Sequence, residues 1–253
     1  MTSFRTLVAS HAGLAEELPL IHTSRCEFLS SIATTHVLEP QPCAIFHESL
    51  VYLFYGRPAY RSHRGSRGGE PHVLCPVCFV FKPRTGSRVV HRVYPCDTGA
   101  VAADRFHPEI LTIDLAPLAL EPQIESARRL VSLLFERNSD YFVGKVVQTH
   151  AFTPGSVGVR FHALLMRTGP VDYDDRKSAI EVQVNQTIAL RDQLLFVVLP
   201  KEFLEETAIR DAIINVWNCD PVIYATFRGD TPASYYAVVR EKVRERFTEA
   251  TRI

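Results

Sequence analysis

Two polar side chains stand where a short apolar segment near the N-terminus ends. His22 and Thr23 follow Pro19–Ile21, which we predict to be a strand because it is apolar and ends in a β-branched residue. Next, Ser24 and Glu27 have the spacing of a capping box, which predicts a helix start. Polar groups between a strand end and a helix start serve a ligand or cap a turn. A neutral imidazole has one donor and one acceptor, so His22 suits adjacent hydroxyl groups such as those of a ribose; the alternative is a structural histidine.

A helix is expected directly after the capping box. Phe28, Leu29 and Ile32 recur at helical spacing, so we expect them to share one face that packs inward. Pro40 and Pro42 end the helix, because proline cannot continue the backbone hydrogen bonds.

An aromatic segment comes after those prolines. Ser49–Tyr55 is rich in β-branched and aromatic residues and is predicted to be a strand, with a short apolar helix as the alternative. Tyr55 is its best candidate for stacking on a planar ligand, with Tyr52 or Phe54 as substitutes, and an ordinary core aromatic is the alternative. Arg57 follows; its guanidinium group can bind two phosphate oxygens, or it is a surface charge after a turn.

The most loop-like segment of the chain is Ser62–Pro71, which combines glycines with charges. Its residues Arg64 and Arg67 can meet a phosphate, but a solvated hairpin tip explains them as well. Tyr60 and Arg61, just before the loop, are weaker candidates for ligand contacts.

A carboxylate stands in the middle of a late strand. Ala179–Val184 alternates, so Glu181 and Gln183 share one face of the predicted strand. Such a residue ordinarily faces solvent on a half-buried sheet. In a cleft, the carboxylate of Glu181 could bind a ribose hydroxyl, stabilise a developing positive charge, and orient or deprotonate an acceptor.

Two cysteines have the spacing of half a zinc site. Cys75 and Cys78 flank a proline and a valine, and His72, His91 or Cys96 could complete four ligands. The surrounding segment is apolar and no second such pair exists in the sequence. Two buried thiols are therefore favoured over zinc.

A different class of function is a cysteine hydrolase. Cys96 or Cys43 would be the nucleophile and one of the ten histidines the base. Cys96 falls in Pro95–Ala100, which we predict to be a turn where a nucleophile can be exposed. No local pattern identifies its partner, because such partners are set by the fold.

The combination of strand, His-Thr, helix, aromatic segment and late acidic strand resembles the ADP-ribosyltransferase superfamily. It is most similar to the DNA-targeting ADP-ribosyltransferase toxins and more distantly similar to tRNA 2′-phosphotransferases. In such enzymes the histidine holds the NAD ribose, an aromatic ring stacks on nicotinamide, and a late strand carries a catalytic glutamate. The resemblance implies these roles here for His22 with Thr23, for Tyr55, and for Glu181 in the run Arg176–Val182.

The resemblance also implies a biological setting. NAD would be the substrate, and a nucleic acid or a protein would be the acceptor. In NAD hydrolysis, water would take the place of the acceptor. An inhibitory protein would be a partner. The role would be that of a bacterial toxin or phage-defence effector. A non-catalytic binding or interaction module on the same fold is the second hypothesis, and the charged last helix could serve its partner.

Composition sets outer limits on these hypotheses. The chain has 253 residues, 46% of them hydrophobic and 22% charged, which is typical of a folded domain. Its formal net charge is zero, so composition does not indicate a strongly basic nucleic-acid surface. The sequence contains no glycine-rich dinucleotide or P-loop motif, no signal-peptide pattern and no apolar run of the roughly 18 residues that a membrane span needs. We expect a cytoplasmic protein with reduced thiols.

We expect a single α+β domain spanning residues 1–253, built on a mostly antiparallel sheet, continuous or split, with flanking helices. The segment 62–158 is an insertion in this interpretation, because it does not align with the family. We predict irregular backbone over Asp140–Gly158 and a turn over Thr168–Lys177. The other expected elements are strands at His72–Phe81, Arg88–Tyr94, Ile110–Leu115, Val159–Met166, Leu194–Leu199 and Val222–Phe227, and helices at Gln123–Asn138, Lys201–Trp217 and from Thr231 onward.

Overall fold

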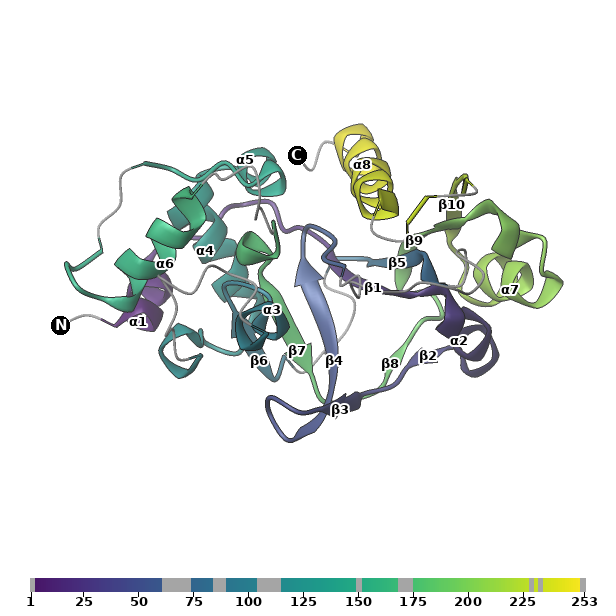
Figure 1. The fold of residues 1–253 in the computed structure, drawn as a ribbon, viewed down its shortest axis with the longest axis horizontal. Helices are drawn as coiled ribbons and strands as arrows, with labels where there is room; N and C mark the ends of the chain where they lie inside the picture. The colour runs from purple at the N-terminus through teal and green to yellow at the C-terminus, as the bar shows by residue number, and fades with distance from the viewer. Residues whose placement is uncertain are drawn as a thin grey trace.

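The fold is a mixed α/β arrangement around one long sheet (Figure 1). It is known from a computed structural model that describes residues 3–60, 74–83, 90–103, 115–148, 152–167, 175–227, 230–231 and 234–250. The predictions for Arg61, Arg64, Arg67, His72 and most of Ile110–Leu115 fall outside the described residues. None of the described helices is long and apolar enough to cross a membrane.

The main sheet contains eight strands among the described residues and is mostly antiparallel. Its order is β10-β9-β5-β1-β4-β7-β6, β3 pairs with β4 outside this order, and β9 and β10 form a parallel pair. A separate ribbon joins β2 to β8. The strands are β1 (Leu20–Arg25), β2 (Val37–Leu38), β3 (Gln41–Cys43), β4 (Glu48–Tyr55), β5 (Pro76–Phe81), β6 (Arg92–Tyr94), β7 (Glu181–Val184), β8 (Ile188–Ala189), β9 (Leu194–Pro200) and β10 (Asp220–Tyr224).

The sheet divides between β1 and β4. These strands pair only at Leu20–Tyr55 and Ile21–Phe54. Beyond Ile21, β1 continues beside β5 as far as Arg25, whereas β4 continues beside β7. The two halves of the sheet therefore separate from His22 onward.

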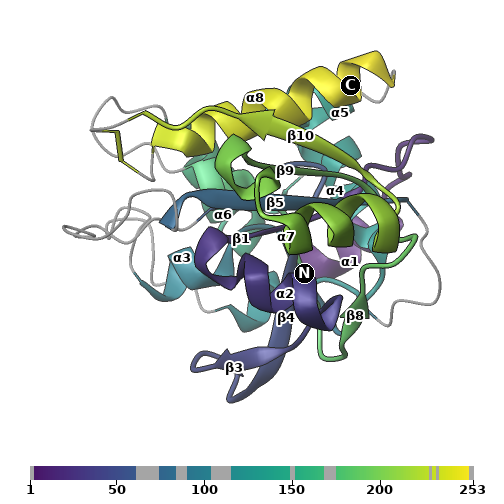
Figure 2. The ribbon, with the colours of Figure 1, turned by 90° about the vertical axis from the view of Figure 1, so that its right-hand side faces the viewer.

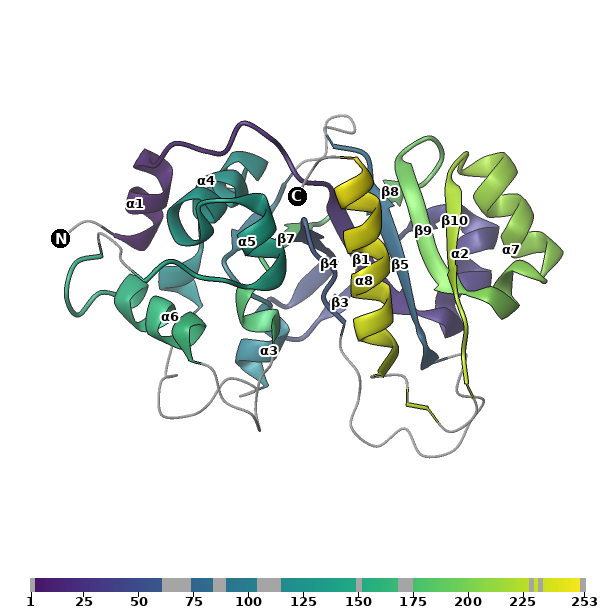
Figure 3. The ribbon, with the colours of Figure 1, turned by 90° about the horizontal axis from the view of Figure 1, so that it is seen from above.

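Helices cover both halves. At one end of the molecule lie α1 (Phe4–Ser10), α4 (Ile124–Phe135), α5 (Asn138–Val143) and α6 (Val157–Met166) (Figure 3). The short helix α3 (Thr98–Ala102) lies beside β6 and β7 (Figure 1). At the other end, α2 (Leu29–Thr35), α7 (Thr207–Asp211) and the π-helical turn Ala212–Val216 cover one face of the sheet. The long helix α8 (Ser234–Glu249) covers the opposite face (Figure 2).

The last helix shows how its sequence selects its packing. Tyr235, Val239, Val243 and Phe247 recur every four residues and are all buried, which places them on one stripe of α8. This stripe packs on β5, β9 and β10, and Phe247 contacts Phe196 of β9 edge to face.

Several predicted elements are confirmed. β5 and β7 lie within the predicted strands, β4 and β9 each extend one residue beyond them, and α4 lies within the predicted helix Gln123–Asn138. The strand at Arg88–Tyr94 is shorter, and the helical segment Lys201–Trp217 consists of a 3-10 turn, α7 and the π-helical turn. Within the segment 62–158, β5 lies between β1 and β9 and β6 pairs with β7, so these two described strands are part of the main sheet.

The prediction of a strand at Val159–Met166 is wrong, because α6 covers it. Alternation along Val159–Met166 suggested a strand, but Ser156 accepts a hydrogen bond from the backbone N–H of Val159 and caps a helix. Phe161 and Leu165, spaced by one helical turn, are buried.

The capping box at Ser24 is also wrong. Ser24 belongs to β1, which stays paired with β5 through Arg25, and the strand ladder holds it in an extended conformation. A 3-10 turn over Cys26–Phe28 then leads into α2 without a side-chain cap at Arg25.

The boundaries around α4, α5 and α3 differ from the predictions as well. The helix α4 ends at Phe135 because Glu136 has a positive φ of 64°. The next helix, α5, then extends into Asp140–Gly158, which was predicted to be irregular. The predicted turn Pro95–Ala100 contains the start of α3, which Asp97 caps through the N–H of Ala100.

Candidate functional site

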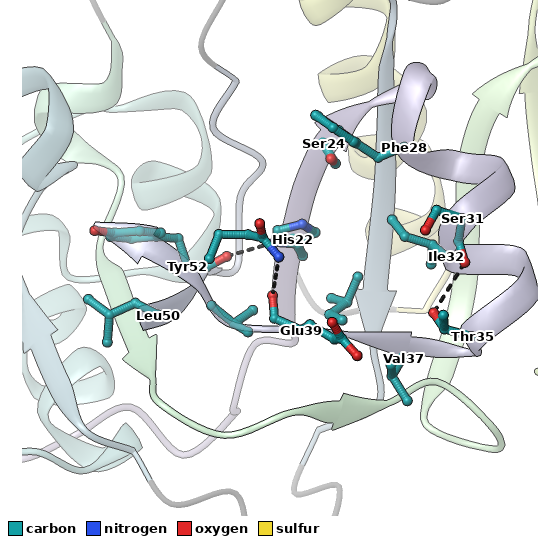
Figure 4. Close-up of a pocket in the computed structure, with 13 residues that line it drawn as sticks. His22, Ser24, Phe28, Ser31, Ile32, Thr35, Val37, Glu39, Leu50 and Tyr52 are labelled. Atoms are coloured by element: carbon teal, nitrogen blue, oxygen red, sulfur yellow. Dashed lines mark hydrogen bonds between the residues drawn. The ribbon is translucent and has the colours of Figure 1, made fainter. Parts of the chain in front are cut away.

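A pocket of about 360 Å³ lies in the wedge between the diverging strands β1 and β4 (Figure 4). This volume falls in the roughly 300–1,000 Å³ range of small-molecule sites. The β1 and β4 strands form two of its walls, and α2 and the segment 37–41 close it. Its lining residues are His22, Ser24, Phe28, Ser31, Ile32, Thr35, Val37, Leu38, Glu39, Gln41, Leu50, Val51 and Tyr52.

The half-buried imidazole of His22 is fixed in the pocket by one hydrogen bond. Its Nδ1 atom lies 2.8 Å from the backbone oxygen of Tyr52 (Figure 4). A carbonyl oxygen only accepts hydrogen bonds, so Nδ1 carries the proton and Nε2 of the neutral ring is an acceptor. Burial lowers the pKa of His22, which favours this neutral form. His22 therefore offers an acceptor suited to a ligand hydroxyl group.

The pocket combines an apolar wall with short polar groups. Ile32, Leu38 and Leu50 supply hydrocarbon surface, and Ser24 and Gln41 supply hydroxyl and amide groups. The side-chain amide of Gln41 also donates to the backbone oxygen of Glu39. A mostly apolar cavity with a few polar groups suits a ligand that has both rings and hydroxyls.

Tyr52 connects the pocket to the rest of β4. It lines the pocket, its backbone oxygen holds His22, and its hydroxyl donates to Sγ of Cys43 at 2.6 Å. Burial raises the pKa of Tyr52, so its hydroxyl remains a donor at neutral pH. Of the three aromatic candidates, the structure brings Tyr52 to His22.

Thr23 does not share the pocket with His22. Adjacent residues of a strand point to opposite faces, and Thr23 lies opposite Cys78 in the β1–β5 ladder. The structure thus separates the two members of the His-Thr pair.

Tyr55 and Phe54 are core residues here. Tyr55 is completely buried, its hydroxyl accepts from the N–H of Leu18 at 3.0 Å, and its backbone oxygen accepts from the hydroxyl of Tyr141 at 2.7 Å. Phe54 packs in a small cluster with Ala59 and is nearly inaccessible. In this structure neither ring has a free face for a ligand.

Arg57 is likewise buried instead of facing the pocket. Its guanidinium donates to Asp175 at 3.0 Å, to the hydroxyl of Ser178 at 2.8 Å and to the backbone oxygen of Tyr141 at 3.3 Å. Asp175 also accepts from Tyr236 and Arg240 of α8. Arg57 therefore anchors a buried ionic network that joins the end of β4 to α8, and it does not line the pocket.

Glu181, at the start of β7, is only 1% exposed. One carboxylate oxygen accepts from the hydroxyl of Thr98 at 2.8 Å and from the amide of Gln183 at 2.6 Å, and the other accepts from the N–H of Thr98 at 2.9 Å. Burial, and secondarily the charge of Asp97, raises the pKa of Glu181 to about 8. Glu181 is a shielded carboxyl group with an unusually high proton affinity.

The strand register relates Glu181 to the pocket. Glu181 lies opposite Phe54, which lies opposite Ile21 of β1. The carboxyl group is therefore level with the point where the halves of the sheet are still joined, one residue before His22. It does not line the pocket.

The cysteines do not form an exposed nucleophile or a metal cluster among the residues that the structure describes. Cys96 is completely buried, and burial together with the charge of Glu181 raises the pKa of its thiol. Cys75 and Cys78 are also buried, and burial raises the pKa of each to about 12. Cys43 is half-buried and bonded to Tyr52.

Comparison with known proteins adds no assignment. No protein-family model matches the sequence, and no curated protein is significantly similar to it. The interpretation of the pocket therefore rests on its own chemistry.

Two pocket residues have roles that the sequence pattern conceals. Phe28 was expected to pack inward with Leu29, yet its side chain is 45% exposed and lines the pocket, whereas Leu29 is completely buried. Gln41 falls between the two prolines that end the helix, in β3. No pattern in the sequence identified Phe28, because the pairing of β1 with β5 through Arg25 sets the 3-10 turn that takes Phe28 off the buried stripe of α2.

Proposed function

We propose that this chain binds NAD in the pocket between β1 and β4 and transfers ADP-ribose to a macromolecular acceptor. The observation that carries the proposal is the division of the sheet beside His22. This division opens a pocket of about 360 Å³ beside the neutral imidazole of His22. The strand β4 lies between β1, which carries His22, and β7, which carries Glu181. The resemblance of the sequence to ADP-ribosyltransferases supports the choice of NAD.

In this proposal, Nε2 of His22 accepts a hydrogen bond from a ribose hydroxyl, and the bond to Tyr52 keeps the ring oriented. The apolar wall with Ile32 and Leu50 covers the rings of the dinucleotide and excludes water. A macromolecular acceptor approaches from solvent, because the pocket is a wedge open at the surface.

Glu181 would act on the ribose next to nicotinamide. A ribose hydroxyl replaces the hydroxyl of Thr98 on the carboxyl group, and the ionised form of Glu181, which predominates above about pH 8, stabilises the positive charge that develops on the ribose. The bond from ribose C1′ to nicotinamide breaks, and the electron pair leaves with nicotinamide. A bond from C1′ to the acceptor nucleophile forms, and the acceptor proton passes to the carboxylate or to water.

The biological role remains part of the proposal. A nucleic acid or protein acceptor, a silencing partner protein and a role as a bacterial toxin or defence effector follow from the resemblance. A cytoplasmic location is supported by the six cysteines, all among the described residues, none of which is in a disulfide, as is usual in reducing compartments.

A second candidate is a nucleotide-binding module without catalysis. The burial of Glu181 favours it, because three hydrogen bonds already occupy its carboxylate oxygens. In this case the pocket binds the ligand, and Glu181 serves only to hold Thr98 at the start of α3.

The test is NAD binding by calorimetry together with release of nicotinamide. We expect His22→Ala to weaken NAD binding about tenfold, the value of one hydrogen bond. We expect Glu181→Gln to retain binding and to lower turnover at least about 100-fold. His11→Ala, at a half-buried histidine outside the pocket, is the matched control. NAD binding by the wild type without turnover, also in the presence of nucleic acid, would favour the second candidate. If the wild type does not bind NAD, the proposed transfer of ADP-ribose is rejected.

A further inference from the structure

Phe28 is an exposed aromatic ring at the pocket. Its side chain is 45% exposed, although Cys26, which begins the same turn, is 1% exposed and Leu29, the next residue, is 0% exposed. The N–H of Cys26 is also bonded to the backbone oxygen of Cys75 at 2.9 Å. The backbone under Phe28 is therefore anchored, and the ring is held at the pocket in advance of any ligand.

A positive charge lies over this ring. The guanidinium carbon of Arg25 is 5.1 Å from the centroid of Phe28, and Arg25 is held by Glu27 at 2.5 Å. An arginine over a phenyl ring is a cation–π pair. Arg25 thus packs against the ring of Phe28, and the same ring lines the pocket where a ligand can reach it.

Phe28 and Glu181 lie toward opposite ends of the split. Glu181 is level with Ile21, where β1 still pairs with β4, and Phe28 follows Arg25 at the far end of β1. The four-residue step from Ile21 to Arg25 corresponds to about 13 Å along a strand. Two ribosides linked by a diphosphate can span such a distance. Figure 4 shows Phe28 beside Ser24, at the end of the pocket away from Leu50.

We infer that Phe28, backed by Arg25, stacks on the adenine ring of the dinucleotide and so determines which end of NAD enters first. This inference rests on the proposed function. Adenine is neutral at pH 7, whereas the positively charged nicotinamide ring of NAD meets a like charge in the guanidinium of Arg25, which the ion pair with Glu27 offsets in part. The guanidinium beside Phe28 thus favours adenine, and the nicotinamide end is directed toward Glu181.

The test compares two halves of the ligand, AMP and nicotinamide mononucleotide, by calorimetry. We expect Phe28→Ala to weaken AMP binding about 5- to 100-fold, the range measured when an aromatic platform under a base is removed. Binding of nicotinamide mononucleotide should change less than about twofold. Phe28→Tyr keeps a ring and should bind AMP as the wild type does. Ile214→Ala, at an apolar side chain 47% exposed outside the pocket, is the control.

A further readout reports stacking directly. In Phe28→Trp, AMP should quench the fluorescence of the new indole, with Trp217, which is completely buried, as a constant background. Equal AMP affinity in the wild type and Phe28→Ala, with NAD still bound, would overturn this inference and leave the proposed function intact. A loss confined to nicotinamide mononucleotide would also overturn it. If no nucleotide binds to the wild type, the proposed function fails and this inference fails with it.

Discussion

The Nδ1 atom of His22 lies 2.8 Å from the backbone oxygen of Tyr52, at the point where the pairing of β1 and β4 ends. The last backbone pair joins Ile21 to Phe54, and one residue later this side-chain bond spans the gap. The imidazole thus takes the place of the next backbone hydrogen bond of the ladder. It holds the mouth of the split at a fixed width and orients the ring.

His22 is expected to be neutral with its proton on Nδ1 throughout the physiological range. The carbonyl partner requires an Nδ1–H donor, and burial lowers the pKa of the ring below its ordinary value of about 6.5. Nitrogen-15 correlation spectra recorded from pH 5 to 8 measure both the position of the proton on the ring and the pKa of the ring. A proton on Nε2, or a titration midpoint above about 6.5, would contradict the assignment.

Glu181 should make the protein less stable as the pH rises. Its folded-state pKa of about 8 exceeds the ordinary value of about 4.3, so between these values the folded protein keeps a proton that the unfolded chain has lost. The stabilisation is complete below about pH 4 and is lost as the pH rises through about 8. Denaturant titrations from pH 5 to 9 on the wild type and Glu181→Gln isolate this effect, because the difference between the two curves belongs to Glu181. A difference that does not vary with pH would refute it.

The sequence predicts much of the sheet because its central strands are locally consistent. β5 and β9 are nearly continuous apolar segments, and both are buried along their length. The errors occur where tertiary contacts decide. Pairing with β5 keeps Ser24 extended against its capping pattern, and a serine cap makes a helix of Val157–Met166, where alternation predicted a strand.

The site was predictable only in part. His22 and Tyr52 do meet at one pocket, but Tyr55 and Arg57 could not be placed from the sequence. The alternation of side chains along β4 does not predict which face of the strand other elements will cover. In the structure, helices cover the face that carries Tyr55, and its side chain is completely buried. The partner of Arg57 is Asp175, 118 residues away in the sequence, a distance over which spacing carries no information.

Removing Arg57 should destabilise the fold strongly. Arg57→Ala would leave Asp175 buried without its most deeply buried partner, and breaking such a pair costs about 3–5 kcal/mol. Arg137→Ala is the control, because Arg137 is 67% exposed and its bond to Asp140 is worth at most about 1 kcal/mol. Urea denaturation at pH 7 measures both. A loss in Arg57→Ala as small as that of the control would mean that the ionic network contributes little.

Cys43 should be the most reactive thiol of the native protein. Cys26, Cys75, Cys78 and Cys96 are buried, and burial raises the pKa of Cys219 to about 12, which leaves little thiolate. A chromogenic disulfide reagent at pH 8 should therefore label one thiol rapidly in buffer and all six in denaturant. Cys43→Ser should abolish the rapid phase. If the rapid phase instead disappears in Cys96→Ser, Cys96 is an activated nucleophile and the hydrolase hypothesis gains support.

Gly56 should tolerate no side chain, whereas Gly155 should tolerate alanine at a modest cost. Both have a positive φ, +69° and +77°, which costs an alanine about 1–2 kcal/mol. At Gly56 a Cβ atom would also lie 2.3 Å from Cδ1 and 2.9 Å from Cβ of the buried Leu18, and such overpacking adds about 1–3 kcal/mol. At Gly155 no atom lies within 4 Å. Thermal unfolding of Gly56→Ala and Gly155→Ala separates the steric cost from the conformational cost. The free energy of unfolding of Gly56→Ala should fall by about 2–5 kcal/mol. Equal losses in the two variants would show that Leu18 moves aside, and that the junction of the two halves of the sheet beside Tyr55 is not tightly packed.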